Sequence, residues 1–375
     1  MMNIGFGTTV LSKGLSNGRL DGIGVYSQSL LDEFQKSKHN ILPLRFYMKE
    51  NIVTDDIVLK DKLQYSVHSG LSAIFNHPIG NFSKIEKELD LFFAPDHHIP
   101  YLKSKPVVAT VMDIIPFIHP EWTSSRFRKL KNFAFKKAIL SADHIITISE
   151  YSKNDIINYF KIDESNISVV PLGVDKKYFK IIDKDKKQNI LKKYNIEKDF
   201  FIFIGTLQPR KNILRIIEAF EQLPLEIKEQ NQLIIIGQNG WNTDELMNKL
   251  TYLEESGHGK WINYIPEDDM LALFQSAISL VYPSLYEGFG LPIIEAFASS
   301  CPVISSNTTS IPEVAGDAAI LVNPSSVKEI SNAMYRIATN IDLRNELIAL
   351  GLKQVKKFTW KKSADEHMKV FKSLL

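Results

Sequence analysis

The sequence predicts an α/β protein with two Rossmann-like domains, each a parallel sheet with helices packed against it. Short apolar runs, which are typical of strands buried on both faces, alternate with helical patterns along the chain. A polar stretch at 176–198, rich in Lys and Asp, divides this alternation into two halves. The length of 375 residues is also typical of two domains. We therefore expect an N-terminal domain at 1–175, a C-terminal domain at 176–357 and a final helix at 358–375.

The first half is a series of buried strands with helices between them. Each expected strand is a short run dominated by apolar residues. These strands lie at 89–95, 107–111 and 144–149, and the run at 169–175 ends this half. The pattern at 125–140 predicts a helix between the second and the third strand, and Ser149 is expected to cap the helix that follows it.

The second half repeats this alternation. We expect strands at 200–205, 232–237, 261–265, 278–282 and 302–305, with helices at 213–222, 244–253, 268–277 and 292–299 and further helices from 327 onward. Alternation on this scale favours parallel sheets, and two such halves predict domains that face a central cleft. In parallel sheets of this kind, ligands bind beyond the carboxyl ends of the strands.

Composition narrows the class of protein. Hydrophobic residues make up 44% of the chain and charged residues 23%, as in ordinary globular proteins. The net charge of +2 excludes a globally basic nucleic-acid binder. The single cysteine, Cys301, excludes an internal disulfide framework, and no spacing of Cys and His predicts a metal site. No signal peptide and no membrane-spanning run is recognisable, so we expect a cytoplasmic protein.

The most informative motif is EGFGLPIIE, in which Glu287 and Glu295 lie eight residues apart. The apolar run before it predicts a strand, and Pro292 predicts the start of a helix. Glu287 is therefore expected in the loop after the strand, and Glu295 in the first turn of the helix. The two glycines between them would let backbone amides approach a ligand, and a helix N-terminus favours phosphate. One carboxylate could hold sugar hydroxyls while the other holds a ribose.

With the preceding Ser284, this stretch resembles the E-x7-E signature of retaining, nucleotide-sugar-dependent glycosyltransferases of family 4, which have the GT-B fold. The resemblance covers nearly the whole chain and is densest at 200–324. It includes the segment at 310–319 and the Phe-Thr-Trp sequence at 358–360. It implies that the last helix returns to the N-terminal domain. It also implies that Glu287 holds the donor sugar and Glu295 the ribose diol.

Arg210 and Lys211 follow a predicted strand and precede a predicted helix. Two fixed cations in such a loop suit a pyrophosphate, because they can neutralise the charge that develops on a leaving nucleoside diphosphate. The resemblance assigns them that role, and a solvated basic loop is the alternative.

A glycine-rich stretch at 18–26 is expected to be a loop before an amphipathic helix. It matches neither a dinucleotide fingerprint nor a Walker A loop. In the family, the matching glycines, here Gly22 and Gly24, line the donor phosphates from the N-terminal domain. An ordinary turn between a strand and a helix is the alternative.

Met112 marks a departure from the family. Many members have His-Asp at this point, where the His organises the reacting sugar, so that role cannot be assigned here. Asp113 could orient the acceptor hydroxyl or accept its proton. Its alternative role is to cap the loop.

The identity of the donor is suggested by GQNGW at 237–241, which resembles a subgroup that transfers mannose from GDP-mannose. Tyr264 and Ile265 are expected to flank the base. Many relatives have Gly at the position of Asn263, so the shape of that loop is an open question. UDP-linked hexoses are the alternative donors.

The predicted site can now be stated as a set of residues. The catalytic residues are Glu287, Arg210, Lys211 and Asp113, and the donor-binding residues are Gly22, Gly24, Gly205, Gly237, Tyr264, Ile265, Gly288, Phe289, Gly290, Leu291 and Glu295. No metal and no cofactor is expected beyond the nucleotide sugar. The predicted reaction is retaining transfer of a hexose to a glycan or a lipid-linked glycan in surface polysaccharide biosynthesis. A nucleotide-sugar-binding protein, an epimerase and a phosphorylase are the alternatives.

A basic and aromatic stretch falls within the helix predicted at 125–140. Its members are Arg126, Phe127, Arg128, Lys129, Lys131, Phe133, Phe135, Lys136 and Lys137. Such a stretch can lie on an anionic membrane surface, and a solvated helix is the alternative.

Overall fold

In the computed structural model, the chain forms two compact units, each built around a parallel sheet. The structure describes residues 1–46, 57–59, 85–123, 128–240 and 244–375. Unit 1 comprises 1–173 and 360–375, and unit 2 comprises 174–359. Among the described residues, no helix is both long enough and apolar enough to cross a membrane.

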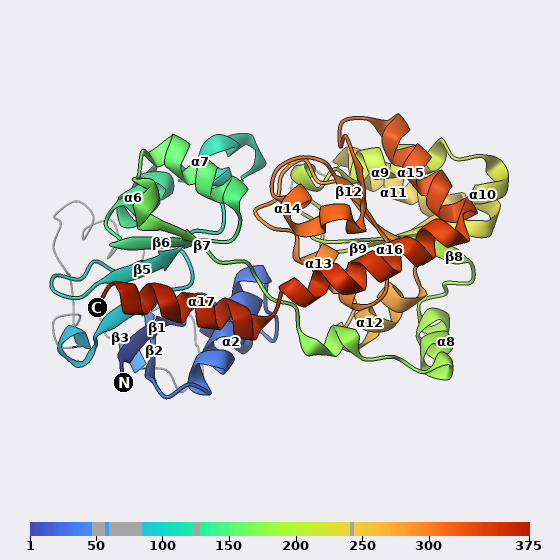
Figure 1. Ribbon diagram of the computed structural model, residues 1–375. Coiled ribbons are helices and arrows are strands. Elements are labelled where there is room, and N and C mark those ends of the chain that lie inside the picture. The colour runs from blue at the N-terminus through green and yellow to red at the C-terminus, as the bar shows by residue number, and fades with distance from the viewer. Residues whose placement is uncertain (47–56, 60–84, 124–127, 241–243) are drawn as a thin grey trace. The chain divides into compact units, whose positions relative to one another are not determined.

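Unit 1 contains a seven-stranded sheet in the order β3-β2-β1-β4-β5-β6-β7. All of its strand pairs are parallel, and helices cover both faces (Figure 1). Its strands are β1 (Asn3–Gly7), β2 (Asn40–Phe46), β3 (Ile57–Leu59), β4 (Leu91–Ala94), β5 (Val107–Thr110), β6 (His144–Thr147) and β7 (Ile167–Val169). Its helices are α1 (Thr9–Ser16), α2 (Gly22–Gln35), α5 (Ile115–Ile118), α6 (Arg128–Leu140), α7 (Glu150–Phe160) and α17 (Trp360–Ser373).

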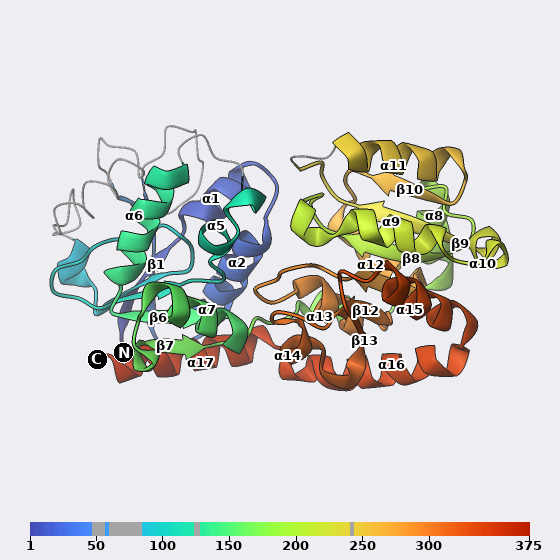
Figure 2. The same cartoon turned by 90° about the horizontal axis from the view of Figure 1, so that it is seen from above.

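Unit 2 contains a six-stranded parallel sheet in the order β10-β9-β8-β11-β12-β13, seen from a second direction in Figure 2. Its strands are β8 (Asp199–Ile204), β9 (Asn231–Ile236), β10 (Gly259–Ile262), β11 (Ser279–Tyr282), β12 (Val303–Ser306) and β13 (Ile320–Val322). Its helices are α8 (Lys184–Lys193), α9 (Ile213–Glu221), α10 (Leu225–Gln230), α11 (Asp244–Glu255), α12 (Glu267–Ser276), α13 (Leu291–Ala298), α14 (Ile311–Ala315), α15 (Val327–Thr339) and α16 (Ile341–Gln354).

The two parallel sheets with helices confirm the predicted fold class, but one local prediction near the N-terminus was wrong. The glycine-rich stretch at 18–26 is not a loop throughout, because α2 begins at Gly22. Asp21 caps this helix by accepting a hydrogen bond of 2.8 Å from the Gly24 amide. Ser149 caps α7 as expected, accepting from the Ser152 amide.

The last helix, α17, packs against α2 inside unit 1. Its Phe371 lies against Phe34 of α2 and Phe93 of β4, with ring centroids 5.8 Å and 5.2 Å apart. Phe6 of β1 joins the same cluster at 5.5 Å from Phe93. Because each ring removes a large apolar area from water, this cluster fixes α17 to the sheet.

A buried imidazole, His367, lies in the middle of this aromatic cluster. Its Nδ1 is 2.7 Å from the Ser363 carbonyl oxygen, which can only accept, so Nδ1 carries the proton. Nε2 therefore accepts the hydrogen bond of 2.8 Å from the Tyr26 hydroxyl, which in turn accepts from Thr110 at 2.9 Å. Burial lowers the pKa of His367 to about 4, so the ring is neutral near pH 7.

We expect His367 to make the stability of unit 1 sensitive to acid. A histidine with a lowered pKa stabilises the folded state above its unfolded pKa, and this contribution disappears as the pH falls to the folded pKa. The difference in free energy of unfolding between the wild type and His367→Gln should therefore shrink by about 3 kcal/mol between pH 6.5 and pH 4. Urea unfolding at a series of pH values measures this difference. His119→Gln, which removes a half-exposed imidazole from the same unit, is the control. A constant difference for His367→Gln would contradict the assignment.

Candidate active site

A buried cluster of charges lies at the carboxyl end of neighbouring strands of unit 2. Glu287 follows β11, and Arg210 and Lys211 follow β8, which pairs with β11. Arg210 Nη1 lies 2.9 Å from Glu287 Oε2, and Lys211 Nζ lies 2.6 Å from Glu287 Oε1. The structure thus brings together three of the four residues predicted for catalysis, at the edge where parallel sheets bind ligands.

The electrostatics of this cluster keep Glu287 ionised. Burial alone would raise the pKa of the Glu287 carboxyl, but the charges of Lys211 and Arg210 hold it at about 2. Lys211 also donates a hydrogen bond to the Tyr282 hydroxyl, and its ammonium lies 4.8 Å from the centre of that ring. Burial raises the pKa of Tyr282 far above its usual range, so the phenol stays protonated. With two cations and one anion, the cluster retains a net positive charge.

Hydrogen bonds from neighbouring loops hold Glu287 in place. Ser310 Oγ donates to the Glu287 carbonyl at 2.8 Å, and the Glu287 amide donates to Thr309 Oγ1 at 3.3 Å. The Arg210 carbonyl accepts from the Leu285 amide at 2.8 Å. Sequence reasoning missed Tyr282, Thr309 and Ser310 as supporting residues. Of these three, only Ser310 lies in the family-like segment at 310–319.

Three of the glycines predicted to bind the donor, Gly205, Gly237 and Gly290, are required by the backbone conformation of the loops or by their packing. A Cβ atom on Gly237 would lie 1.9 Å from the Gly205 carbonyl oxygen, so no larger residue fits there. Gly205 and Gly237 both have φ near 150°, which L-residues rarely adopt. Gly290 has a φ of 101° at the N-cap of α13, between Gly288 and Leu291. The loops after β8 and β9 therefore approach each other closely.

Three predicted donor-binding side chains differ in exposure. Phe289 is buried against Phe358, with ring centroids 5.6 Å apart, so its side chain belongs to the core of unit 2. Ile265 is also buried, whereas Tyr264 is 50% exposed and accessible to a ligand. Trp241, the last residue of the GQNGW stretch, lies outside the described residues.

Glu295 lies in an environment unlike that of Glu287. It was predicted in the first turn of the helix, but α13 begins at Leu291, which puts Glu295 in the second turn. Burial raises the pKa of its carboxyl to about 7, against the lowering effects of a hydrogen bond with Tyr178 and of the charge of Lys177. A single motif thus supplies one carboxylate whose pKa is lowered by two cations and one whose pKa is raised by burial. Sequence reasoning missed Tyr178 as its partner.

The predicted residues of unit 1 lie at the start of α2 and after β5. A Cβ atom on Gly24 would lie 3.0 Å from Leu20 Cδ2, whereas one on Gly22 would meet open space. The Asp21 carboxylate occupies the N-cap of α2, so an anion binding there has to compete with it.

Asp113, in the loop after β5, is half-buried and accepts a hydrogen bond of 3.1 Å from the Ile115 amide. This bond is the contact expected of a loop cap. The role of Asp113 toward the acceptor hydroxyl stays a prediction.

The sequence predicted no metal site. Among the described residues, however, one group of side chains has ligand atoms that lie close enough together to hold a metal ion. This group is Asp96, His97 and His98, at the end of β4. Sequence reasoning missed it because it considered the spacing of Cys and His pairs and gave no weight to consecutive ligands.

Comparisons with known proteins identify the family. Residues 183–354 match the family model described as "Glycosyl transferases group 1", and residues 86–178 match "Glycosyltransferase Family 4". The chain is 31% identical over 287 residues to O-antigen chain mannosyltransferase B of Escherichia coli, covering 76% of this chain and 74% of that protein. It is 28% identical over 281 residues to the serotype-specific mannosyltransferase WbdA of Escherichia coli, covering 72% of this chain but only 33% of that longer protein.

A solved structure shows the same fold. The sucrose-phosphate synthase of Thermosynechococcus elongatus superimposes with a TM-score of 0.76 at 17% identity, covering 100% of this chain and 99% of that one. At this identity the likeness concerns the fold, which is GT-B. From the two family models, the identity to an O-antigen mannosyltransferase and the fold, we conclude that this chain belongs to the group 1 glycosyltransferases, family 4.

Proposed function

We propose that the protein transfers mannose from GDP-mannose to a hydroxyl of a growing glycan or a lipid-linked glycan, with retention of anomeric configuration. The observation that carries the proposal is the buried cluster of Glu287, Arg210 and Lys211 beyond β8 and β11. Two curated relatives with mannosyltransferase names support the sugar, and one named for O-antigen chains supports a role in surface polysaccharide biosynthesis such as lipopolysaccharide assembly.

The cluster is suited to a nucleoside diphosphate because it has a surplus of positive charge. When a diphosphate binds, its oxygens compete with Glu287 for Arg210 and Lys211, and both cations can neutralise the leaving group. Glu287 then becomes available to accept hydrogen bonds from the sugar hydroxyls. Because two cations supply the charge that a divalent ion would otherwise provide, we propose that transfer needs no metal.

The proposed retention rests on the resemblance to retaining glycosyltransferases of family 4, and the state of Glu287 bears only on how retention would be achieved. A carboxylate held by two cations, with a pKa of about 2, is a weak nucleophile toward a sugar carbon. We therefore favour front-face substitution assisted by the leaving phosphate over a covalent intermediate on Glu287. Glu295 is proposed to hold the ribose diol, since its carboxyl can both donate and accept hydrogen bonds near pH 7.

Asp113 is proposed to act on the acceptor, from unit 1. Its carboxylate follows β5 at the ligand-binding edge of that sheet. A carboxylate at that point can orient the attacking hydroxyl or accept its proton.

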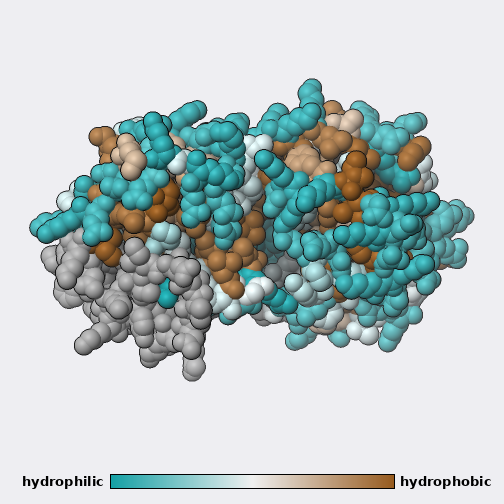
Figure 3. Space-filling view, turned by 90° about the horizontal axis from the view of Figure 1, so that it is seen from below, coloured by the Kyte–Doolittle hydropathy of each residue, from teal (hydrophilic) through white to brown (hydrophobic). Residues whose placement is uncertain are grey.

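We also propose a cytoplasmic enzyme with peripheral contact to the membrane face. Helix α6 exposes Lys129, Lys131, Lys136 and Lys137 together with Leu130 and Phe133, which are 66% and 48% exposed. Cations and apolar side chains on one surface helix favour an anionic lipid surface. Figure 3 looks onto a different face, seen from below, where apolar patches also lie among hydrophilic residues. Arg126 and Phe127 of the basic stretch lie outside the described residues.

Two alternatives stay open beside this proposal. A UDP-hexose could be the donor, because the GQNGW argument rests on a short loop. A nucleotide-sugar-binding protein or an epimerase would use the same charged cluster without transfer to an acceptor. Release of nucleoside diphosphate distinguishes an enzyme from a binding protein, and a new sugar nucleotide formed from donor alone would indicate an epimerase.

The identity of the donor can be tested by thermal shift. GDP-mannose at a hundred times its dissociation constant should add about 2.7 kcal/mol to the free energy of unfolding, and UDP-glucose at the same concentration should add much less. Stabilisation by UDP-glucose alone would overturn the choice of donor.

The role of Lys211 can be tested with Lys211→Met, which keeps the apolar stem and removes the charge. The variant leaves Glu287 with Arg210 as its cation, so we expect a loss of about 1–3 kcal/mol in the free energy of unfolding. Affinity for the nucleoside diphosphate should fall about tenfold to a hundredfold. The control is Lys192→Met on the exposed part of α8. Unchanged affinity in a folded Lys211→Met protein would remove Lys211 from the site.

The two carboxylates should differ in their effect on binding of the nucleoside diphosphate. Glu295→Ala removes the proposed ribose partner and should weaken binding. Glu287→Ala removes the anion that competes for Arg210 and Lys211, so binding should be kept or strengthened while transfer falls. Isothermal titration calorimetry with GDP measures both affinities. Equal losses in the two variants would contradict this division.

A further inference from the structure

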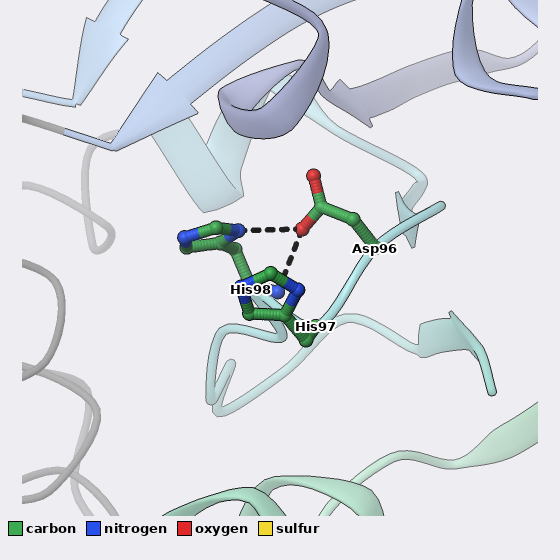
Figure 4. A group of neighbouring side chains, drawn as sticks. All are labelled: Asp96, His97 and His98. Atoms are coloured by element: carbon green, nitrogen blue, oxygen red, sulfur yellow. Dashed lines mark hydrogen bonds and ion pairs between the residues drawn. The ribbon is translucent and has the colours of Figure 1, made fainter. Parts of the chain in front are cut away.

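Three consecutive residues at the carboxyl end of β4 form a compact group of ligand atoms that the proposed transfer reaction does not use. Asp96, His97 and His98 each offer one oxygen or nitrogen atom, and these atoms lie within 4.8 Å of one another. In Figure 4, the two imidazole rings lie beside each other and close to the carboxylate. Their centroids are 4.2 Å apart.

The carboxylate of Asp96 is a fixed and buried negative charge. Its Oδ2 accepts a hydrogen bond of 3.1 Å from the Val10 amide, and its Oδ1 accepts one of 2.7 Å from the His98 amide. The position of this carboxylate is therefore set by the backbone of the first turn of α1 and of the loop after β4.

The two histidines differ in access to solvent. His98 is buried, with Nδ1 2.7 Å from Asp96 Oδ1 and its ring near that of Phe46. His97 is exposed. An ion can therefore reach the group through His97 without opening the core, while Asp96 and His98 are already held together.

We propose that Asp96, His97 and His98 bind a divalent transition-metal ion of the class that prefers imidazole, such as Zn²⁺ or Ni²⁺. Two imidazoles with one carboxylate favour these ions over Mg²⁺ and Ca²⁺, which prefer oxygen ligands. The ion takes the place of the proton shared by His98 Nδ1 and Asp96 Oδ1, and that proton is released to solvent. Water fills the remaining coordination positions.

The site belongs to unit 1, whereas the charged cluster proposed for the donor belongs to unit 2. Metal binding can therefore be measured without donor or acceptor.

The test is calorimetric titration of the full chain, first stripped of metal by a chelator, with ZnCl₂ and with MgCl₂. We expect saturable binding of one Zn²⁺ per chain and no binding of Mg²⁺. His97→Ala should weaken Zn²⁺ binding at least about tenfold, because one of three protein ligands is lost. The matched control is His119→Ala, which removes another imidazole of unit 1 that lies 3.0 Å from a carboxylate, that of Glu121. This variant should bind Zn²⁺ like the wild type.

Because His97 is exposed, its replacement leaves the buried pair of Asp96 and His98 intact, and an unchanged melting temperature without metal confirms the fold. The absence of saturable Zn²⁺ binding would overturn the proposal. Affinity that is unchanged in His97→Ala, or reduced equally in His119→Ala, would overturn it as well.

Discussion

The ion pairs that Glu287 forms with Arg210 and Lys211 are the interaction on which the rest of the candidate site depends. A buried carboxylate is tolerated only when it is paired, and removing one partner leaves an uncompensated charge. These pairs join the loop after β8 to the loop after β11, and Ser310 adds the loop after β12 through the Glu287 carbonyl. The same contacts that hold the loops together leave one positive charge in excess. An excess of positive charge at this point is what the proposed binding of a diphosphate requires.

The two carboxylates of the EGFGLPIIE motif show how environment separates side chains of identical chemistry. Glu287 faces two cations, which hold its pKa at about 2, whereas burial raises the pKa of Glu295 to about 7. One is an acceptor at every physiological pH, and the other can also donate a hydrogen bond. This difference suits the two roles proposed for them, one toward the donor sugar and one toward the ribose diol.

The close approach of the backbone in the loops after β8 and β9 is the second constraint on the candidate site. Gly237 fits against the Gly205 carbonyl, and Gly240 against that of Leu207, where a Cβ atom would lie 1.9 Å and 2.0 Å away. These glycines hold the loops after β8 and β9 together, whatever ligand they also contact. In unit 1, closure depends on α17, whose His367 and Phe371 fill the space between α2 and β4. The last helix of the chain therefore covers part of the first sheet.

The sequence by itself determined the alternation of strands and helices, the family and the identity of most candidate site residues. Apolar runs buried on both faces give a strong local signal, which is why the strand expected at 200–205 lies at 199–204. That signal is weak in β1 and β2, where Gly, Asn, Pro and Arg interrupt the run, and neither strand was predicted. The start of α2 was missed because glycine disfavours helix locally, while the Asp21 cap and the burial of Tyr26 stabilise it in the fold.

Only the tertiary structure decided which side chains form ion pairs and hydrogen bonds with each other. Glu287 lies 77 residues from Arg210 and Tyr26 lies 341 residues from His367 in the sequence, so no local pattern could pair them. The protonation states follow from the same contacts, because a pKa depends on burial and on partners brought from other elements. Asp96, His97 and His98 are adjacent in the sequence, yet the burial of two of them and the exposure of the third exist only once β4 has taken its place between β1 and β5.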